Sequence, residues 1–159
     1  MTLQPHVYAN DLYPALSASD LSANDHPRRR TILLVEDEPF VREATCGILQ
    51  HAGFEVLPTA DTQEAMKVFE GRPRGIELVM TDMVLPGATG QQLGQDLRLR
   101  SPEVVVLVTS GYGNPEYDTE APGSRTYFLA KPYSRKTLLE KIEQILGALP
   151  LARPATQAG

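Results

Sequence analysis

A regular alternation of strand-like and helix-like segments is the feature that most constrains how this chain can fold. Five short, mostly apolar segments have the length of strands: Ile32–Val35, Glu55–Pro58, Ile76–Thr81, Val104–Val108 and Tyr127–Ala130. Runs of this kind indicate strands that are covered on both faces. The segments between them carry apolar residues at helical spacing. The order strand, helix, strand therefore predicts an α/β domain with a doubly wound, five-stranded parallel sheet.

Local signals predict where the helices begin and how the sheet is bounded. Pro39 suits the first turn of a helix that Gly53 ends. Asp61, followed three residues later by Glu64, predicts a capping box for the next helix. Pro58 favours an edge position for the second strand. The first helix is predicted to bury one face, made of Val41, Ala44, Thr45, Ile48 and Ala52.

The stretch between the fourth and fifth strands departs from this regular pattern. Its sequence, GYGNPEYDTEAPGSR, holds two prolines and three glycines and has almost no apolar periodicity. Proline and glycine are the poorest helix formers. The fourth helix is therefore predicted to be short or irregular.

Length and composition place one domain in a chain of 159 residues. We expect a flexible tail over residues 1–29, the domain over 30–149 and a second tail over 150–159.

No apolar stretch approaches the ~20 residues that cross a bilayer, and the N-terminus does not have the pattern of a signal peptide. A single cysteine, Cys46, excludes a disulfide framework. The net charge of −5 argues against nucleic acid as the main partner. These features predict a cytoplasmic protein without a membrane segment.

Chemically active side chains follow four of the predicted strands. The first strand is followed by Glu36, Asp37 and Glu38, and the third ends at Asp82. The fourth ends with Thr109-Ser110, and Lys131 follows the fifth. In open parallel sheets, ligands bind beyond the carboxyl ends of the strands. Clustered carboxylates suit Mg²⁺, a carboxylate can attack phosphorus, and an ammonium group can pair with phosphoryl oxygens.

Four motifs in order carry a family resemblance. VEDEP lies at the first strand, DMVLPGATG at the third, TSG at the fourth and KP at the fifth. Together they resemble the receiver domain of two-component response regulators. The resemblance covers roughly Arg30 to Leu149. The wording TSGY and FLAKP is most similar to receivers of hybrid sensor kinases and to their stand-alone relatives. The resemblance implies a flavodoxin-like (βα)5 fold.

The resemblance also implies a phosphoacceptor site. Asp82 would take a phosphoryl group from a sensor histidine kinase or a histidine phosphotransfer protein. Asp37 and Asp82 would bind Mg²⁺ directly, together with the backbone carbonyl of Val84. Glu36 stands where an aspartate is more frequent and would act through water. Lys131 would contact the phosphoryl group.

Further positions of the family motif fall on the later strands. The hydroxyl residue is Ser110, because the following Gly111 matches the small residue of the family motif. Thr109 is the competing choice, and strand alternation lets only one of the two face the site. Phe128 occupies the aromatic switch position. Pro132 is expected to follow a cis bond. Val84 and Tyr112 fall where the family tunes the lifetime of the phosphoryl group, and their apolar and aromatic side chains predict slow self-dephosphorylation.

Several readings of the function stay open at this point. The chain is expected to signal by contact with a downstream protein or by onward phosphotransfer, without binding DNA and without being an enzyme. We favour a stand-alone protein over a receiver cut from a hybrid sensor histidine kinase or from an output domain. An aspartyl-phosphate phosphohydrolase is a further alternative, but Val84 stands where that class needs a second aspartate. A degenerate receiver is disfavoured by the complete set of acids, hydroxyl and lysine.

Overall fold

The computed structural model describes residues 29–72, 75–111 and 123–147. Its main feature is a five-stranded sheet in the order β2-β1-β3-β6-β7, in which every neighbouring pair is parallel. The strands are β1 (Thr31–Val35), β2 (Glu55–Thr59), β3 (Leu78–Asp82), β6 (Val105–Ser110) and β7 (Thr126–Ala130). The predicted parallel sheet is confirmed. Pro58 lies in β2, which is an edge strand, as expected.

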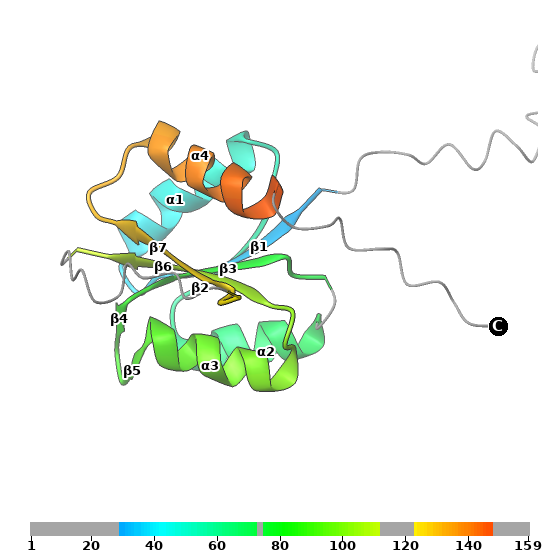
Figure 1. The fold of residues 1–159 in the computed structure, drawn as a ribbon. Helices are drawn as coiled ribbons and strands as arrows, with labels where there is room; N and C mark the ends of the chain where they lie inside the picture. Colours follow the sequence, from blue (N-terminus) through cyan, green and yellow to red (C-terminus); the bar gives the residue numbers. More distant parts are fainter. Residues whose placement is uncertain (1–28, 73–74, 112–122, 148–159) are drawn as a thin grey trace, which may run out of the picture.

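Helices cover both faces of this sheet. Figure 1 shows α1 (Pro39–His51) and α4 (Arg135–Gly147) on one face, and α2 (Thr62–Gly71) and α3 (Gly90–Arg100) on the other. This arrangement confirms the doubly wound class. The segment for which we expected a short or irregular fourth helix falls mostly in 112–122, outside the described residues. The two predicted tails also lie outside them, apart from residue 29.

The core lies in two layers because successive strand residues point to opposite faces. In β1, Ile32 and Leu34 belong to the cluster under α1 and α4, whereas Leu33 and Val35 belong to the cluster under α2 and α3. All four side chains are at most 2% exposed. Burial on both faces explains why the strands are recognisable as apolar runs.

The cap of α2 differs slightly from the predicted capping box. Asp61 is the N-cap, and its side chain accepts a hydrogen bond from the backbone N–H of Glu64 at 2.8 Å. The carboxylate of Glu64 accepts instead from the N–H of Ala60, one residue before the expected donor. The helix start is therefore correct, and only the reciprocal bond is shifted.

The buried face of α1 matches the predicted face only in part. Thr45 is buried and Ile48 packs half-buried against the core, as predicted. Val41, Ala44 and Ala52 are exposed, and Leu49 is buried instead. Leu49 was not assigned to the face, although it carries more apolar surface than the two alanines and gains more from burial. The helix is therefore rotated toward Leu49.

A two-stranded antiparallel ribbon between β3 and α3 was not predicted. Strands β4 (Val84–Leu85) and β5 (Ala88–Thr89) pair around a turn in which Gly87 has a φ of 77°. A glycine adopts this backbone conformation without a steric penalty.

Nowhere in the described ranges is a helix both long and apolar enough to cross a membrane.

Candidate functional site

An acidic cluster lies at the point where the strand order reverses. From β1 the chain moves outward to β2 and then returns to β3 on the other side, so the carboxyl ends of β1 and β3 flank the crevice between them. Glu36 and Asp37 follow β1, and Asp82 is the last residue of β3. Single ligand atoms of these three residues lie within 4.8 Å of one another. The three predicted acids are therefore brought together.

Lys131, directly after β7, reaches the same cluster. Its Nζ lies 3.0 Å from Oδ2 of Asp82 and 3.5 Å from Oε2 of Glu36. The three acids differ in their exposure: Glu36 is buried at 5% relative exposure, Asp82 is half-buried, and Asp37 is exposed. The peptide bond between Lys131 and Pro132 is cis, as the resemblance implied.

Burial and charge act against each other in this cluster. Burial raises the pKa of Glu36, and the charge of Asp82 acts in the same direction. The N–H of Glu38 and the ammonium of Lys131 favour the carboxylate, but they do not outweigh burial. For Lys131, burial favours the neutral amine, yet its hydrogen bond to Asp82 and the nearby charges raise its pKa overall.

The backbone after Asp82 is held by two neighbouring elements. The N–H of Met83 donates to the carbonyl of Thr109 at 2.8 Å, and the carbonyl of Met83 accepts from Gly90 at 3.0 Å. A Cβ on Gly90 would lie 2.3 Å from the carbonyl oxygen of Asp82 and 2.9 Å from Cγ2 of Thr81. No side chain fits there. The start of α3 therefore packs directly on the backbone of Asp82.

No role for Gly90 was identified from the sequence. The available signal was its place after a helix cap: Thr89 and Gln92 form a reciprocal capping box, which makes Gly90 the first helical residue. A poor helix former at that position indicates a close backbone contact.

Thr109 and Ser110 lie on opposite sides of β6. Leu107 and Val108 belong to the clusters on the two faces, so alternation places Thr109 with Leu107 and Ser110 with Val108. Thr109 is 2% exposed, and its hydroxyl donates to the carbonyl of Thr81 at 3.4 Å. Ser110 is half-buried, and its carbonyl accepts the N–H of Lys131 at 2.7 Å.

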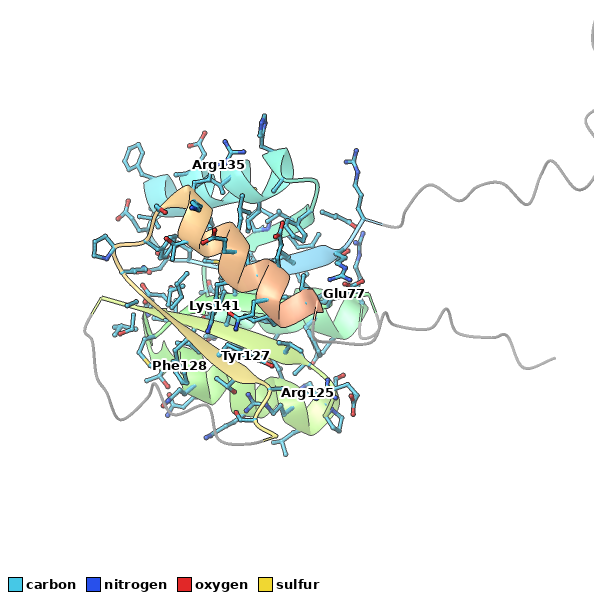
Figure 2. All side chains as sticks on the ribbon, turned by 45° about the horizontal axis from the view of Figure 1, so that its top comes forward. Glu77, Arg125, Tyr127, Phe128, Arg135 and Lys141 are labelled. Carbon is cyan, nitrogen blue, oxygen red and sulfur yellow. The ribbon has the colours of Figure 1, made fainter. Side chains whose placement is uncertain are left out.

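The two aromatic residues of β7 also separate by alternation. Phe128 is half-buried and packs against the cluster under α2 and α3, on the same side as Ser110. Tyr127 packs on the other side, where Nζ of Lys141 in α4 lies 5.7 Å from its ring centroid (Figure 2). Val84 is 67% exposed beside the cluster. Tyr112 lies outside the described residues.

Arg42 in α1 is a further residue at the site that sequence reasoning did not find. Its Nη1 donates to the carbonyls of Glu36 at 2.7 Å and Asp37 at 3.3 Å. Sequence spacing alone gives no sign of this contact, because it joins a side chain to backbone oxygens.

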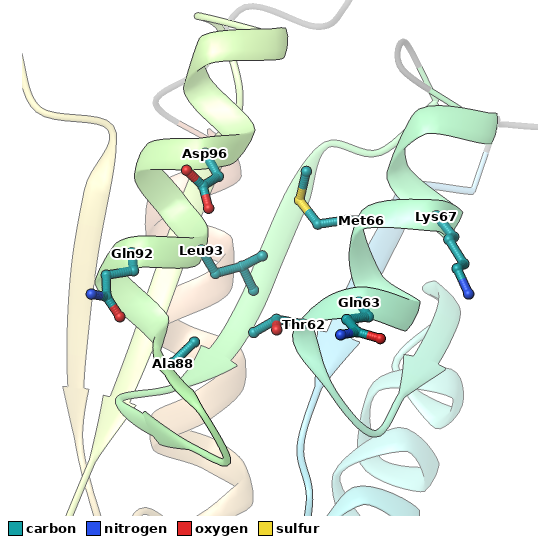
Figure 3. A pocket seen from close by; sticks show the side chains of 8 residues that line it. All are labelled: Thr62, Gln63, Met66, Lys67, Ala88, Gln92, Leu93 and Asp96. Atoms are coloured by element: carbon teal, nitrogen blue, oxygen red, sulfur yellow. The ribbon is translucent and has the colours of Figure 1, made fainter.

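A separate groove lies between α2 and α3. It has a volume of about 340 Å³, and none of the predicted site residues lines it (Figure 3). Its lining is formed by Thr62, Gln63, Met66, Lys67, Ala88, Gln92, Leu93 and Asp96.

This fold, with three carboxylates and a lysine at the switch point, defines the class of receiver domains of two-component signal transduction. The chain belongs to the response regulator receiver domain family, which matches it over residues 32–143. The resemblance drawn from the four motifs is thereby confirmed.

Curated relatives are longer proteins. The chain is 32% identical over 130 residues to the sensor kinase CckA of Brucella abortus (strain 2308), a match that covers 81% of this chain and 13% of that protein. In general the chain spans about half the length, or less, of the curated relatives that it matches.

Solved structures show the same fold. The receiver domain of the hybrid histidine kinase CckA is 35% identical, with a TM-score of 0.62 and coverage of 73% of this chain and 98% of that chain. The response regulator protein TrrA of Thermotoga maritima, in complex with Mg²⁺-BeF, is 25% identical with a TM-score of 0.63. That match covers 73% of this chain and 98% of TrrA.

Proposed function

We propose that this chain is a phosphoacceptor whose reacting residue is Asp82. The observation that carries the proposal is the 3.0 Å contact between Lys131 and the carboxylate of Asp82, beside two further acids at the switch point. In the proposed step a carboxylate oxygen of Asp82 attacks phosphorus. The bond from phosphorus to the donor imidazole nitrogen breaks, and that nitrogen keeps the electron pair.

The donor set fits Mg²⁺. Three clustered carboxylates offer only oxygen ligands, and Mg²⁺ prefers oxygen and keeps several waters. Asp37, Asp82 and the backbone carbonyl of Val84 would hold the ion, and Glu36 would act through water. When bound, Mg²⁺ offsets negative charge on the phosphoryl oxygens. The related protein TrrA was solved in complex with Mg²⁺-BeF, which supports the same choice of ion here.

The remaining site residues are proposed to bind the phosphoryl group and to respond to its presence. The ammonium of Lys131 would pair with a phosphoryl oxygen, and the hydroxyl of Ser110 would donate to another. Ser110 is favoured over Thr109 because the Thr109 hydroxyl is buried and bonded to the Thr81 carbonyl. Phe128 lies on the same side of the sheet as Ser110, which supports its role as the switch residue.

The partners and the output follow from the same proposal. The phosphoryl donor would be a sensor histidine kinase or a histidine phosphotransfer protein, and the output would be contact with a downstream protein or onward transfer. The chain would not be an enzyme. Val84, exposed beside the cluster, cannot orient a water as an amide or carboxylate would, so self-dephosphorylation should be slow. The cytoplasmic location remains a prediction from the sequence.

A second setting is favoured by the likeness to the CckA proteins. With 32% and 35% identity to a sensor kinase and to a hybrid-kinase receiver, this domain would equally suit a hybrid sensor histidine kinase. In both settings the proposed chemistry is the same. Only the protein that receives the phosphoryl group would differ.

Acetyl phosphate tests the proposal directly. Wild-type protein incubated with acetyl phosphate and Mg²⁺ should gain the mass of one phosphoryl group, which hydroxylamine removes. Asp82→Asn should gain none. Asp96→Asn, which changes an exposed aspartate on α3, is the matched control and should label like wild type. A hydroxylamine-labile phosphoryl group on Asp82→Asn would show that the acceptor is another residue.

A further inference from the structure

The side chain of Arg42 binds the backbone of the first two acidic residues that follow β1. Its side-chain Nη1 donates to the carbonyls of Glu36 and Asp37, at 2.7 and 3.3 Å. The carbonyl of Glu38, the N-cap of α1, accepts only the ordinary first helical bond from the N–H of residue 42, which any residue except proline would make. The side chain of Arg42 therefore binds two successive carbonyls of the loop. Hydrogen bonds from a charged donor are stronger than those between neutral groups.

Asp37 is the acid whose position depends most on this contact. Lys131 pairs with Glu36 and with Asp82, but no cationic side chain in the described residues lies within 4.0 Å of the Asp37 carboxylate. Asp37 is also exposed, so packing does not hold its side chain. Its place near the other two acids is therefore set mainly by the backbone that carries it.

We propose that Arg42 is a positioning residue that holds the Glu36–Asp37 backbone so that Asp37 is preorganised to bind Mg²⁺ at the acidic cluster. This inference rests on the proposed function, because it concerns the ion that the phosphoacceptor site would hold. Arg42 acts through the backbone and need not touch the ion or the phosphoryl group.

Charge supports the same role. Three carboxylates within 4.8 Å repel one another, and repulsion favours a loop conformation that separates them. The half-buried guanidinium of Arg42 opposes that movement in two ways. It binds the carbonyls, and it brings a positive charge to the loop that carries two of the acids. No carboxylate side chain among the described residues competes for it within 4.0 Å.

The test measures Mg²⁺ binding by NMR, from the amide shifts of residues 36–38 and 82–84. Arg42→Met keeps the apolar stem but removes the donors, and should raise the dissociation constant for Mg²⁺ about 10-fold or more. Arg42→Lys keeps the charge and should restore part of the affinity. Arg125→Met is the matched control. Arg125 also donates to a backbone carbonyl, that of Glu103, but it precedes β7 at the other end of the sheet. The dissociation constant of Arg125→Met for Mg²⁺ should stay within about twofold of that of wild type.

Two further measurements separate positioning from chemistry. At saturating Mg²⁺, the labelling rate of Arg42→Met by acetyl phosphate should return close to that of wild type. A rate that stays low would place Arg42 in the reaction itself and overturn a positioning role. Without metal, the amides of Glu38 and Arg42 should exchange hydrogen faster in Arg42→Met than in wild type.

The outcomes distinguish this inference from the proposed function. Unchanged Mg²⁺ affinity and unchanged exchange in Arg42→Met, with normal labelling of wild type, would overturn the role of Arg42 alone. An equal loss of affinity in Arg125→Met would overturn it as well, because the effect would then be general. If wild type neither binds Mg²⁺ nor becomes labelled, the proposed function fails and the preorganised Mg²⁺ site fails with it.

Discussion

At the scale of single residues, Glu36 carries an unusual combination of burial and charge. It is 5% exposed, yet its carboxyl group meets Lys131 at 3.5 Å and accepts the N–H of Glu38 at 3.1 Å. An ion pair normally lowers the pKa of an acid. Here burial outweighs it, and the pKa of Glu36 is raised. The charged form of Glu36 is therefore unfavourable for the folded protein in the absence of metal.

This shift predicts a pH dependence of stability. Because the pKa of Glu36 is higher in the folded state than in the unfolded state, the folded state binds more protons at pH values between the two. Stability from this group is therefore lost as the pH rises through the raised pKa. In metal-free buffer at about pH 8, Glu36→Gln should melt roughly 2–5 °C above wild type. The gap should shrink as the pH falls through the raised pKa and should close at about pH 4, below the ordinary pKa of a glutamate.

Thermal melts followed by circular dichroism at several pH values, in the presence of a chelator, provide the measurement. Titrating groups remote from the cluster are common to both proteins, so the difference between the two melting temperatures reports Glu36 together with its neighbours Lys131 and Asp82. A difference that stays constant across this pH range would contradict the assigned shift.

Residues differ in how far the sequence reveals their role. Asp82 and Lys131 could be predicted for the site because each stands at the end of a recognisable apolar strand. Arg42 could not, since its side chain meets backbone carbonyls that only the folded chain brings near. Gly90 left only an indirect signal, a poor helix former directly after a helix cap, which does not name the carbonyl it contacts. The sequence reports the chemistry of a side chain, but not which carbonyls it will meet.

At the scale of elements, the junction between β3 and α3 determines how Asp82 is presented. Gly90, the first residue of α3, packs on the carbonyl of Asp82, and the Thr89–Gln92 capping box fixes the start of the helix. The sheet and the starts of α1 and α2 were predictable, because short apolar runs mark the strands and Pro39 and Asp61 mark the helix starts. The β4–β5 ribbon was not, since strands of two residues show no periodicity.

The junction predicts opposite effects for two glycine substitutions. Gly90→Ala forces a Cβ to within 2.3 Å of a backbone oxygen and should destabilise the fold by about 1–3 kcal/mol. Gly47→Ala is the matched control inside α1, where a Cβ meets nothing within 4 Å. There alanine should stabilise the helix by about 0.5–1 kcal/mol. Urea unfolding midpoints measure both, and equal shifts in one direction would refute the close contact at Gly90.

At the scale of the whole molecule, the parallel sheet concentrates like charge at one edge. Separate segments of the chain bring three carboxylates there. In the described structure, the positive charges near them are those of Lys131 and of Arg42, which binds the backbone of the loop after β1. Within the described residues, this arrangement leaves Asp37 without a cationic side chain. A cation that binds the folded state alone would therefore add stability by mass action.

Metal binding should accordingly appear as a change in global stability. With Mg²⁺ at about 100 times its dissociation constant, wild type should gain about 2.7 kcal/mol of unfolding free energy, and a chelator should remove the gain. Asp37→Ala should show almost no gain. Without metal it should be at least as stable as wild type, because one repelling charge is gone. Asp96→Ala removes an exposed carboxylate on α3, away from the cluster, and should respond to Mg²⁺ like wild type. Denaturant unfolding with and without Mg²⁺ measures all three proteins, and an equal gain in Asp37→Ala would place the metal elsewhere.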